Sequence, residues 1–250
     1  MKYYIELSDK RNTVVKNLLS NKGEDVEEFL WEKVDEIQRQ DICVFSPAKK
    51  FQREDLEKFP QGISLVCGNL SDENLTIIKS KEIKHINLMS DEEFTIKNAN
   101  LTAEGVLAIM LEKSPRSMFE NNVLILGGGR IARALAVLFG KLGVKFAIVS
   151  YNEVKFPTYY IYTDKCYFKD SFKHDLKEYD IIVNTIPDLF FNEELVSMVE
   201  KDTLFIETAS VKCLDESLVK NFEYVLAPAL PQRFSHETAG KLVLERILKG

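Results

Sequence analysis

The sequence predicts an α/β protein with parallel sheets, divided into two domains. Short apolar runs alternate with segments of helical periodicity along the 250 residues, a pattern typical of parallel sheets whose strands are joined by helices. A run of three glycines at positions 127–129 directly follows one apolar run and precedes an amphipathic segment. We expect one domain over residues 1–100 and a second over residues 101–250, with a cleft between them.

The first 100 residues are expected to form the smaller domain, with a flavodoxin-like α/β architecture. Four apolar runs are predicted to be strands: YYIEL at 3–7, DICVF at 41–45, ISLVC at 63–67 and HINLM at 85–89. Two segments with polar starts and apolar residues at steps of three and four are predicted to be helices: RNTVVKNLLSN at 11–21 and DENLTIIKSK at 72–81.

The second domain is expected to begin with a helix over LTAEGVLAIMLEKSP, residues 101–115. Thr102 is the expected N-cap, Glu104 in the first turn suits the helix dipole, and Pro115 prevents the helix from continuing. Strands are then predicted at 121–129, 145–150, 179–187, 203–210 and 224–230, and helices at 130–143, 192–201 and 237–249. This order is typical of a doubly wound, Rossmann-type domain that binds a dinucleotide.

The loop after the first of these strands carries the pattern G-x-G-x-x-A, formed by Gly127, Gly129 and Ala132. Gly127 allows a tight turn, Gly129 lets the backbone approach a pyrophosphate, and the small Ala132 lets helix and strand pack closely. The helix N-terminus presents N–H groups to the anion, and Arg130 is placed to add a charge-assisted contact. A purely structural turn would not need Gly129, so the pattern predicts dinucleotide binding.

The end of the following strand indicates which dinucleotide is bound. An NAD site usually carries Asp or Glu there, whereas this strand ends in Ser150-Tyr151-Asn152 and the first acid is Glu153. A carboxylate at this place would repel a 2′-phosphate, so its absence favours NADP, with Ser150, Asn152 and Lys155 as candidate phosphate partners. NAD remains the alternative, because no arginine occupies the strand end.

Four further segments accompany the glycine loop: TAEG at 102–105, VNTIP at 183–187, IETAS at 206–210, and LAPALP followed by ETAG within 226–240. Together they resemble the A chain of bacterial dipicolinate synthase, from about residue 101 to the C-terminus. The resemblance implies an NADP-dependent oxidoreductase that converts a dihydrodipicolinate-type product of the lysine pathway into dipicolinate, the calcium chelator of endospores. It also implies a role in sporulation and a flavoprotein-type B chain as partner.

The sequence departs from the family pattern where the substrate is expected to lie. The family's Gly-Gly-Asp-x-Arg turn keeps Asp9 and Arg11 here but loses both glycines. Its Ala-Pro-Gly-Leu-Pro-Gly turn is Ala-Pro-Ala-Leu-Pro-Gln at 227–232, and a lysine before Thr-Ala-Gly is matched by His236-Glu237. Two alternatives therefore stay open: an oxidoreductase of another small carboxylate, and a non-catalytic NADP-binding regulatory subunit.

Three residues are candidates for the catalytic centre. Asn184 ends a buried strand at the carboxyl edge of the sheet, where such folds bind ligands; an ordinary strand exit is the alternative. Glu104 is expected to face the cleft, with a purely structural role as an equal alternative. A neutral His236 is able to take the proton released when a dihydropyridine ring aromatises; a solvent-facing histidine is the favoured alternative.

The remaining candidates bind cofactor or substrate. A dicarboxylate substrate needs cations, and guanidinium groups bind carboxylates in a bidentate manner. The residues expected to contact it are Arg11, Thr102, Pro228 and Arg233, of which Pro228 begins a stiff, extended loop to Pro231. The residues expected to bind the cofactor are Gly127, Gly128, Gly129, Arg130, Ile131, Ser150, Tyr151, Asn152, Thr185, Ile186, Pro187, Thr208 and Ala209.

Composition argues against several other classes of protein. A formal net charge of -6 is unfavourable for nucleic-acid binding. The start, MKYYIELSDK, is not a signal peptide, and no apolar run is long enough to cross a bilayer. The four cysteines lack CxxC spacing, which is typical of reduced, buried thiols rather than zinc ligands or disulfides. We expect a cytoplasmic protein without a metal site, and a homo-oligomer.

Overall fold

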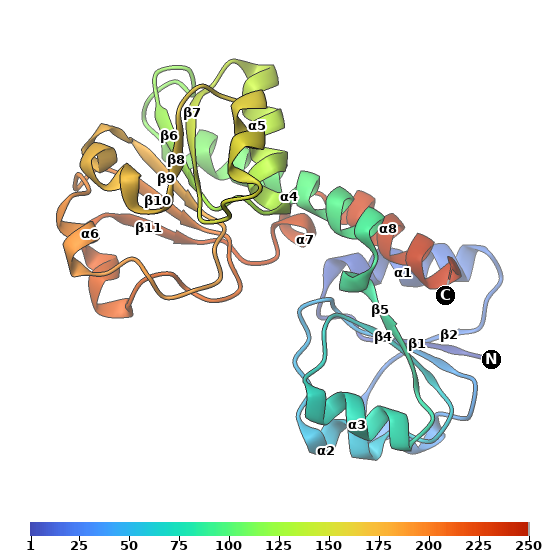
Figure 1. The fold of residues 1–250 in the computed structure, drawn as a ribbon. Coiled ribbons are helices and arrows are strands. Elements are labelled where there is room, and N and C mark those ends of the chain that lie inside the picture. Colours follow the sequence, from blue (N-terminus) through green and yellow to red (C-terminus); the bar gives the residue numbers. More distant parts are fainter. Residues whose placement is uncertain (250) are drawn as a thin grey trace. The chain divides into compact units, whose positions relative to one another are not determined.

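The chain forms two compact units in the computed structural model, which describes residues 1–249 (Figure 1). Unit 1 comprises Met1–Asn98 together with the residues from Pro231 on, and unit 2 comprises Ala99–Leu230. Both units are α/β with an all-parallel sheet. The fold class predicted from the sequence is therefore confirmed.

Unit 1 has a five-stranded sheet in the order β2-β1-β3-β4-β5, which is the flavodoxin-like order. Its strands are β1 (Tyr3–Ile5), β2 (Val26–Glu28), β3 (Ile42–Val44), β4 (Ser64–Cys67) and β5 (Lys84–Asn87). The helices of its N-terminal segment are α1 (Lys10–Asn21), α2 (Arg53–Lys58), α3 (Asp72–Ser80) and the 3-10 turns η1 (Trp31–Glu36) and η2 (Leu88–Ser90). The apolar side chains of β1, β3 and β4 alternate between two buried faces, as a sheet covered on both sides requires.

The C-terminal helix α8 (His236–Lys249) packs against α1 on one face of this sheet, and α2 and α3 cover the opposite face (Figure 1). A Cβ at Gly240 would lie 2.6 Å from Cβ of Val14 and 2.7 Å from the backbone oxygen of Arg11. Only a glycine allows this approach of the two helices. The Thr-Ala-Gly sequence of residues 238–240 thus has a packing role within unit 1.

Unit 2 has a six-stranded sheet in the order β11-β10-β9-β6-β7-β8. Its strands are β6 (Asn122–Leu126), β7 (Lys145–Ser150), β8 (Cys166–Phe168), β9 (Ile181–Asn184), β10 (Leu204–Glu207) and β11 (Glu223–Leu226). Numbered from β6 as the first strand, this is the doubly wound order of dinucleotide-binding domains, which reverses direction between β6 and β9. Ligands of such sheets bind outside the carboxyl ends of the strands at that reversal.

Helices and 3-10 turns cover both faces of this sheet. One buried cluster joins α4 (Glu92–Lys113) and α5 (Arg130–Leu142) to the sheet, and a second joins η4 (Lys169–Glu178) and α6 (Glu193–Ser197) to its other face. The remaining segments are η3 (Phe156–Ile161) and η5 (Glu216–Asn221), and α7 (Leu230–Phe234) begins at the last residue of unit 2 and continues into unit 1. Helix α5 begins at the glycine loop and ends at Gly143, whose φ of 76° is the left-handed conformation that terminates many helices.

Three expectations about local structure need correction. Helix α4 begins at Glu92, not at Leu101, because the side-chain oxygen of Asp91 accepts the N–H of Phe94 and caps the helix there. Thr102 is therefore not an N-cap, and Glu104 lies in the middle of the helix rather than in its first turn. Residues 228–231 are not an extended loop throughout, since α7 begins at Leu230.

The compact units also differ from the expected division at residue 100. The boundary between Asn98 and Ala99 falls inside α4, and the residues from Pro231 on belong to unit 1 rather than to the second domain. The physical reason is the apolar side of α8, whose buried residues, among them Ala239, Val243 and Ile247, are covered within unit 1.

The four cysteines are free thiols, of which Cys43, Cys67 and Cys213 are buried and Cys166 is half-buried. Burial raises the pKa of the Cys67 thiol to about 12 and that of the Cys166 thiol to about 11, so both are protonated near neutral pH. Within residues 1–249, no helix is long and apolar enough to cross a membrane, and no group of three or more metal-ligating side chains is found.

Candidate functional site

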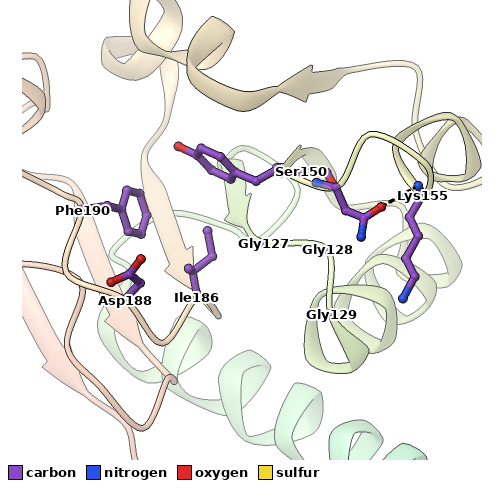
Figure 2. A pocket seen from close by; sticks show the side chains of 10 residues that line it. Gly127, Gly128, Gly129, Ser150, Lys155, Ile186, Asp188 and Phe190 are labelled. Carbon is purple, nitrogen blue, oxygen red and sulfur yellow. Dashed lines mark hydrogen bonds between the residues drawn. The ribbon is translucent and has the colours of Figure 1, made fainter.

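A cavity of about 480 Å³ lies at the carboxyl edge of the unit 2 sheet, next to the reversal between β6 and β9. Figure 2 shows the glycine loop in its centre, with residues that follow β7 on one side and residues that follow β9 on the other. The lining residues are Gly127, Gly128, Gly129, Ser150, Tyr151, Asn152, Lys155, Ile186, Asp188 and Phe190. Volume and position both suit a nucleotide.

The three positions of the loop are glycine for different reasons. Gly127 has a φ of 116°, and a Cβ there would lie 2.2 Å from the hydroxyl oxygen of Thr185. At Gly128 a Cβ would lie 2.2 Å from the hydroxyl oxygen of Tyr159. Gly129 differs from both, because its φ of -80° and ψ of -164° suit any residue and a Cβ would meet nothing within 4 Å. The protein itself therefore requires Gly127 and Gly128 but leaves the space beside Gly129 open.

The strand end after β7 forms one wall of the cavity. Ser150 is 1% exposed, and its hydroxyl accepts the backbone N–H of Asn152 at 3.2 Å. The side-chain oxygen of Asn152 accepts the backbone N–H of Lys155 at 2.9 Å (Figure 2). These bonds form a tight polar turn at the place where the sequence predicts a phosphate on the ribose. The side chain of Lys155 supplies the cation of this wall.

Tyr151 stands at the same strand end and is 42% exposed. Its hydroxyl donates to a carboxylate oxygen of Asp170 at 3.0 Å, and its ring lies 6.2 Å from the ring of Phe190 in an edge-to-face arrangement. Burial and the bond to Asp170 raise the pKa of the Tyr151 phenol. The hydroxyl is therefore protonated at neutral pH, and the two rings give the cavity an aromatic part that suits a flat base.

The opposite wall follows β9 and consists of Ile186, Asp188 and Phe190 (Figure 2). Thr185 fixes its beginning, since its hydroxyl donates to the backbone oxygen of Leu126 at 2.8 Å. Asp188 and Phe190 were not among the predicted residues. Their position directly after the VNTIP motif was the available signal, because a strand end that binds a ligand usually continues into the wall of the site.

Behind this wall lies a fully buried pair, Asn184 and Glu207. The amide nitrogen of Asn184 donates to Glu207 at 2.8 Å and to the backbone oxygen of Ile186 at 2.9 Å, and its oxygen accepts the N–H of Ile186 at 3.1 Å. Glu207 also accepts the backbone N–H groups of Ala209 at 3.0 Å and Cys213 at 2.9 Å. Both hydrogens of the Asn184 amide are used, so its geometry suits holding Ile186 in place rather than contacting a ligand.

Five other predicted cofactor residues lie around the cavity without lining it. Thr208 donates its hydroxyl to the backbone oxygen of Asn184 at 2.6 Å, which ties the ends of β9 and β10 together. Arg130 is exposed in the first turn of α5, Ile131 is half-buried beside it, and Pro187 is exposed after β9. Ala209 is half-buried, and its N–H binds Glu207.

The predicted substrate and catalytic residues are divided between the two units. Glu104 is exposed on α4 and lines a small groove with Ala134 and Val137 of α5, so the glycine-loop cavity does not include it. Thr102 is buried in α4, and Pro228 is exposed after β11. Arg11, Arg233 and His236 belong to unit 1.

Arg11 is not a free cation. Its guanidinium donates to both carboxylate oxygens of Asp9 at 2.9, 3.1 and 2.5 Å, and it also reaches the hydroxyl of Ser46 at 3.4 Å. Asp9 and Arg11 are 2% and 3% exposed. Burial opposes the charge of Asp9, yet the bonds from Arg11 outweigh it, and the pKa of the carboxyl is lowered. Arg233 lies at the surface with its guanidinium 4.7 Å from the ring centre of Phe234, and His236 is half-buried at the start of α8.

No family model matches this chain. Its two parallel sheets are nevertheless shared with dehydrogenases. An NAD-dependent formate dehydrogenase from Staphylococcus aureus, solved in complex with NAD, superposes with a TM-score of 0.63 at 13% sequence identity, covering 100% of this chain and 94% of that one. The chain thus shares its fold with this dehydrogenase, and unit 2 has the Rossmann-type strand order.

Among proteins of this fold, the chain resembles the A chain of dipicolinate synthase. The structure of that chain from Bacillus halodurans has a TM-score of 0.85 at 19% identity, and the match covers 99% of this chain and 97% of that one. For the A chain from Bacillus subtilis the TM-score is 0.83 at 20% identity, with coverage of 100% and 95%. In sequence, the dipicolinate synthase A chain of Bacillus subtilis (strain 168) is 24% identical over 213 residues, 82% of this chain and 71% of that protein. The resemblance found in the motifs is confirmed.

Proposed function

We propose that this chain is an NADP-dependent oxidoreductase that oxidises a dihydrodipicolinate-type precursor to dipicolinate, as the A chain of a dipicolinate synthase-like enzyme. The dehydrogenase fold and the resemblance to the dipicolinate synthase A chain support the reaction class. The glycine loop and the turn after β7 would hold the cofactor, which would supply the hydride acceptor for the dihydropyridine-type ring, while a base of the protein would take the ring proton. Aromatisation drives the step, so the protein mainly has to position the two rings.

The observation that carries the proposal is the open space beside Gly129. This glycine has a backbone conformation open to every residue and no neighbour within 4 Å of a Cβ, so the fold gives no reason for it. A dinucleotide does, because its pyrophosphate approaches the backbone at this position and at the first N–H groups of α5. Gly127 and Gly128 differ from Gly129 in this respect, because a side chain at either position would clash with the protein itself. The same loop therefore provides the comparison for Gly129.

The polar turn after β7 supports NADP over NAD. Of its cavity-lining residues Ser150, Tyr151, Asn152 and Lys155, none is acidic and one is cationic. A 2′-phosphate gains charge-assisted bonds from Lys155 and hydrogen bonds from the Asn152 amide. The carboxylate of Asp188 lies in the opposite wall, after β9 (Figure 2), where it does not take the place of the ribose-binding acid of an NAD site.

We propose the following roles for the remaining residues. The Asn184–Glu207 pair positions Ile186 and the wall that holds the nicotinamide half of the cofactor. Pro228 and Arg233 contribute to substrate binding, and Glu104 and His236 stay the candidate proton acceptors. Arg11 is buried against Asp9 and Thr102 is buried in α4, so the roles of these two residues are structural. A flavoprotein-type B chain is the proposed partner of a homo-oligomeric A chain in the cytoplasm, where four free thiols are stable.

A second function, oxidation of another small carboxylate, is favoured by one observation. Ala229 and Gln232 stand where the resemblance expects glycines, and Ala229 adopts a φ of 51° that glycine would adopt without cost. The backbone turn is therefore kept while side chains are added to it, which is a way to change the shape of a substrate site. The same fold and cofactor would serve either carboxylate.

The test is the formation of dipicolinate from freshly generated dihydrodipicolinate precursor with NADP+, with and without a B chain. Product formed together with an equal amount of NADPH is the expected result, and the comparison shows whether this chain suffices alone. NADP+ binding without product under either condition would contradict the dipicolinate reaction and favour the other carboxylate or a regulatory role. NAD+ in place of NADP+ is the control for the cofactor.

A further inference from the structure

We propose that Tyr159, a residue outside the cavity lining, positions the glycine loop for the pyrophosphate of the dinucleotide. The inference rests on the proposed function, because it concerns the same cofactor site. Tyr159 lies in η3, the 3-10 turn between β7 and β8. It is therefore separated from the loop in sequence by all of α5 and β7.

The contact between Tyr159 and the loop is direct and buried. The Tyr159 side chain is 1% exposed, and its hydroxyl donates to the backbone oxygen of Gly128 at 2.5 Å. A carbonyl oxygen bound in this way fixes the plane of the peptide that joins Gly128 to Gly129. The N–H of Gly129 belongs to that same peptide, so the tyrosine hydroxyl sets the direction in which a phosphate-binding N–H points.

Gly128 shows the same contact from the other side. A Cβ at this position would lie 2.2 Å from the Tyr159 hydroxyl oxygen, 2.7 Å from the adjoining ring carbon and 3.0 Å from the hydroxyl oxygen of Ser150. Its φ is not in the left-handed region, so the backbone alone does not require glycine. Gly128 is glycine because Tyr159 occupies the space where its side chain would be.

Tyr159 is itself held from the strand end that forms the neighbouring wall. Within that turn the backbone oxygen of Asn152 accepts the N–H of Phe156 at 2.9 Å. The backbone oxygen of Lys155 accepts two hydrogen bonds from Thr158, one from its backbone N–H at 3.0 Å and one from its side-chain hydroxyl at 2.6 Å. A hydrogen-bonded segment thus runs from Asn152 and Lys155, the candidate partners of the 2′-phosphate, to Tyr159, whose hydroxyl contacts the glycine loop. Tyr159 is the positioning residue that this segment presents to the loop.

The decisive experiment compares two ligands on the full-length Tyr159→Phe variant, by calorimetry or by fluorescence titration. NADP+ contains the pyrophosphate, and adenosine 2′-monophosphate lacks it but keeps the adenine and the 2′-phosphate. Loss of the buried hydrogen bond is expected to raise the Kd for NADP+ about ten-fold. The Kd for adenosine 2′-monophosphate is expected to change less than about two-fold, because this ligand has no pyrophosphate and does not need the glycine loop.

The chain offers a matched control in Tyr160, the next residue of η3, which is 52% exposed. Tyr160→Phe removes the same hydroxyl at the surface and is expected to leave both Kd values unchanged. Equal weakening of the two ligands by Tyr159→Phe would overturn the inference, since the residue would then support the whole domain. An unchanged Kd for NADP+ would overturn it as well.

A second variant keeps the inference testable if Tyr159→Phe does not fold. Gly128→Ala disturbs the same contact from the loop side and is expected to weaken NADP+ while sparing adenosine 2′-monophosphate. Where both variants fold, their effects on NADP+ should not add in the double variant, because both act through one contact; full additivity would contradict the inference. If wild-type protein binds adenosine 2′-monophosphate but not NADP+, or neither ligand, the proposed function fails, and this inference fails with it.

Discussion

The carboxyl edges of the two sheets use their polar residues in opposite ways. In unit 1 the charged residues after β1, Asp9 and Arg11, are buried and bind each other, so their charges are neutralised within the protein. In unit 2 the strand ends around β6 surround a cavity of about 480 Å³ with a glycine loop, a polar turn and two aromatic rings. Both sheets are parallel and covered on both faces, so the sheet type does not explain the difference.

A structural strand end and a ligand-binding strand end therefore differ in what they leave unsatisfied. A structural one satisfies its own donors and acceptors, as the Asp9–Arg11 pair does. A ligand-binding one has a position, here Gly129, at which the fold leaves space that it does not need. Substitutions at each edge test this contrast, and their expected effects span several kcal/mol down to less than about 1 kcal/mol.

The largest effect is expected from Asp9→Ala. The substitution leaves the buried guanidinium of Arg11 without its partner and removes the cap that accepts the Arg11 N–H at 2.9 Å. Loss of one partner of a buried pair typically costs about 3–5 kcal/mol. We expect a decrease of this size in the free energy of unfolding, measured by urea denaturation. The double variant Asp9→Ala with Arg11→Met should recover part of the loss; no recovery would mean that the pair itself is not the cause.

Gly129→Val is expected to abolish dinucleotide binding while leaving the fold intact. The added side chain fills only the space beside the loop, so we expect the Kd for NADP+ to rise at least about 100-fold, or roughly 2.7 kcal/mol. The midpoint of thermal unfolding should stay within a few degrees of wild type. Gly140→Val on the same helix is the matched control, because a Cβ at Gly140 also meets nothing within 4 Å. If the Gly129→Val variant still binds NADP+, the interpretation of the loop as a nucleotide-binding loop is wrong.

Acid should remove the stability contributed by the Asp9–Arg11 pair. The pKa of Asp9 is lowered in the folded protein, so its contribution is fully present above the unfolded pKa of about 3.9 and is lost as the pH falls through the lower folded value. Urea midpoints of wild type should therefore fall more steeply than those of Asp9→Asn as the pH is lowered from about 5.5 to about 3. Parallel curves for the two proteins would show that other carboxyls dominate.

The smallest effect is expected from Ala229→Gly, which restores the glycine that the resemblance expects. Ala229 has a φ of 51°, a conformation that costs a residue with a Cβ about 1–2 kcal/mol. Part of this gain is offset by the greater freedom of glycine in the unfolded chain, so a net stabilisation of about 0.5–1 kcal/mol is expected. Ala227→Gly, at a buried position two residues earlier, should destabilise instead. Equal effects at the two positions would contradict the argument from φ.

The central strands of both sheets were predictable from the sequence, but two edge strands were not. Residues 26–28, VEE, and residues 166–168, CYF, lie at the edges of their sheets and are only three residues long. Neither has room for a hydrophobic period, and the first is mainly acidic, so pattern analysis has nothing to detect. The start of α4 was missed for a related reason: TAEG offered a plausible cap at Thr102, while the capping bond is made by Asp91.

The residues that line the cavity were predictable where they belong to a recognisable pattern in the sequence. Gly127, Gly129 and the acid-free strand end at residues 150–152 line the cavity and were predicted from the sequence alone. Tyr159 was not, because no motif links a residue of a 3-10 turn to a loop that precedes it by a helix and a strand. The buried hydrogen bond of Asn184 to Glu207 could not be predicted from the sequence either. Glu207 lies on the neighbouring strand, and only strand pairing in the sheet brings the two residues together.

Unit 1 is assembled from both ends of the described chain, and this has a consequence for synthesis on the ribosome. Helix α1 emerges early, but the partner that covers it, α8, is translated only after the whole of unit 2. At about 5–20 residues per second this delay is on the order of ten seconds. During that time the face of α1 around Val14 stays exposed, while unit 2, a continuous insertion, has all its residues available. Nascent unit 1 is therefore the part of this protein that chaperones are expected to protect.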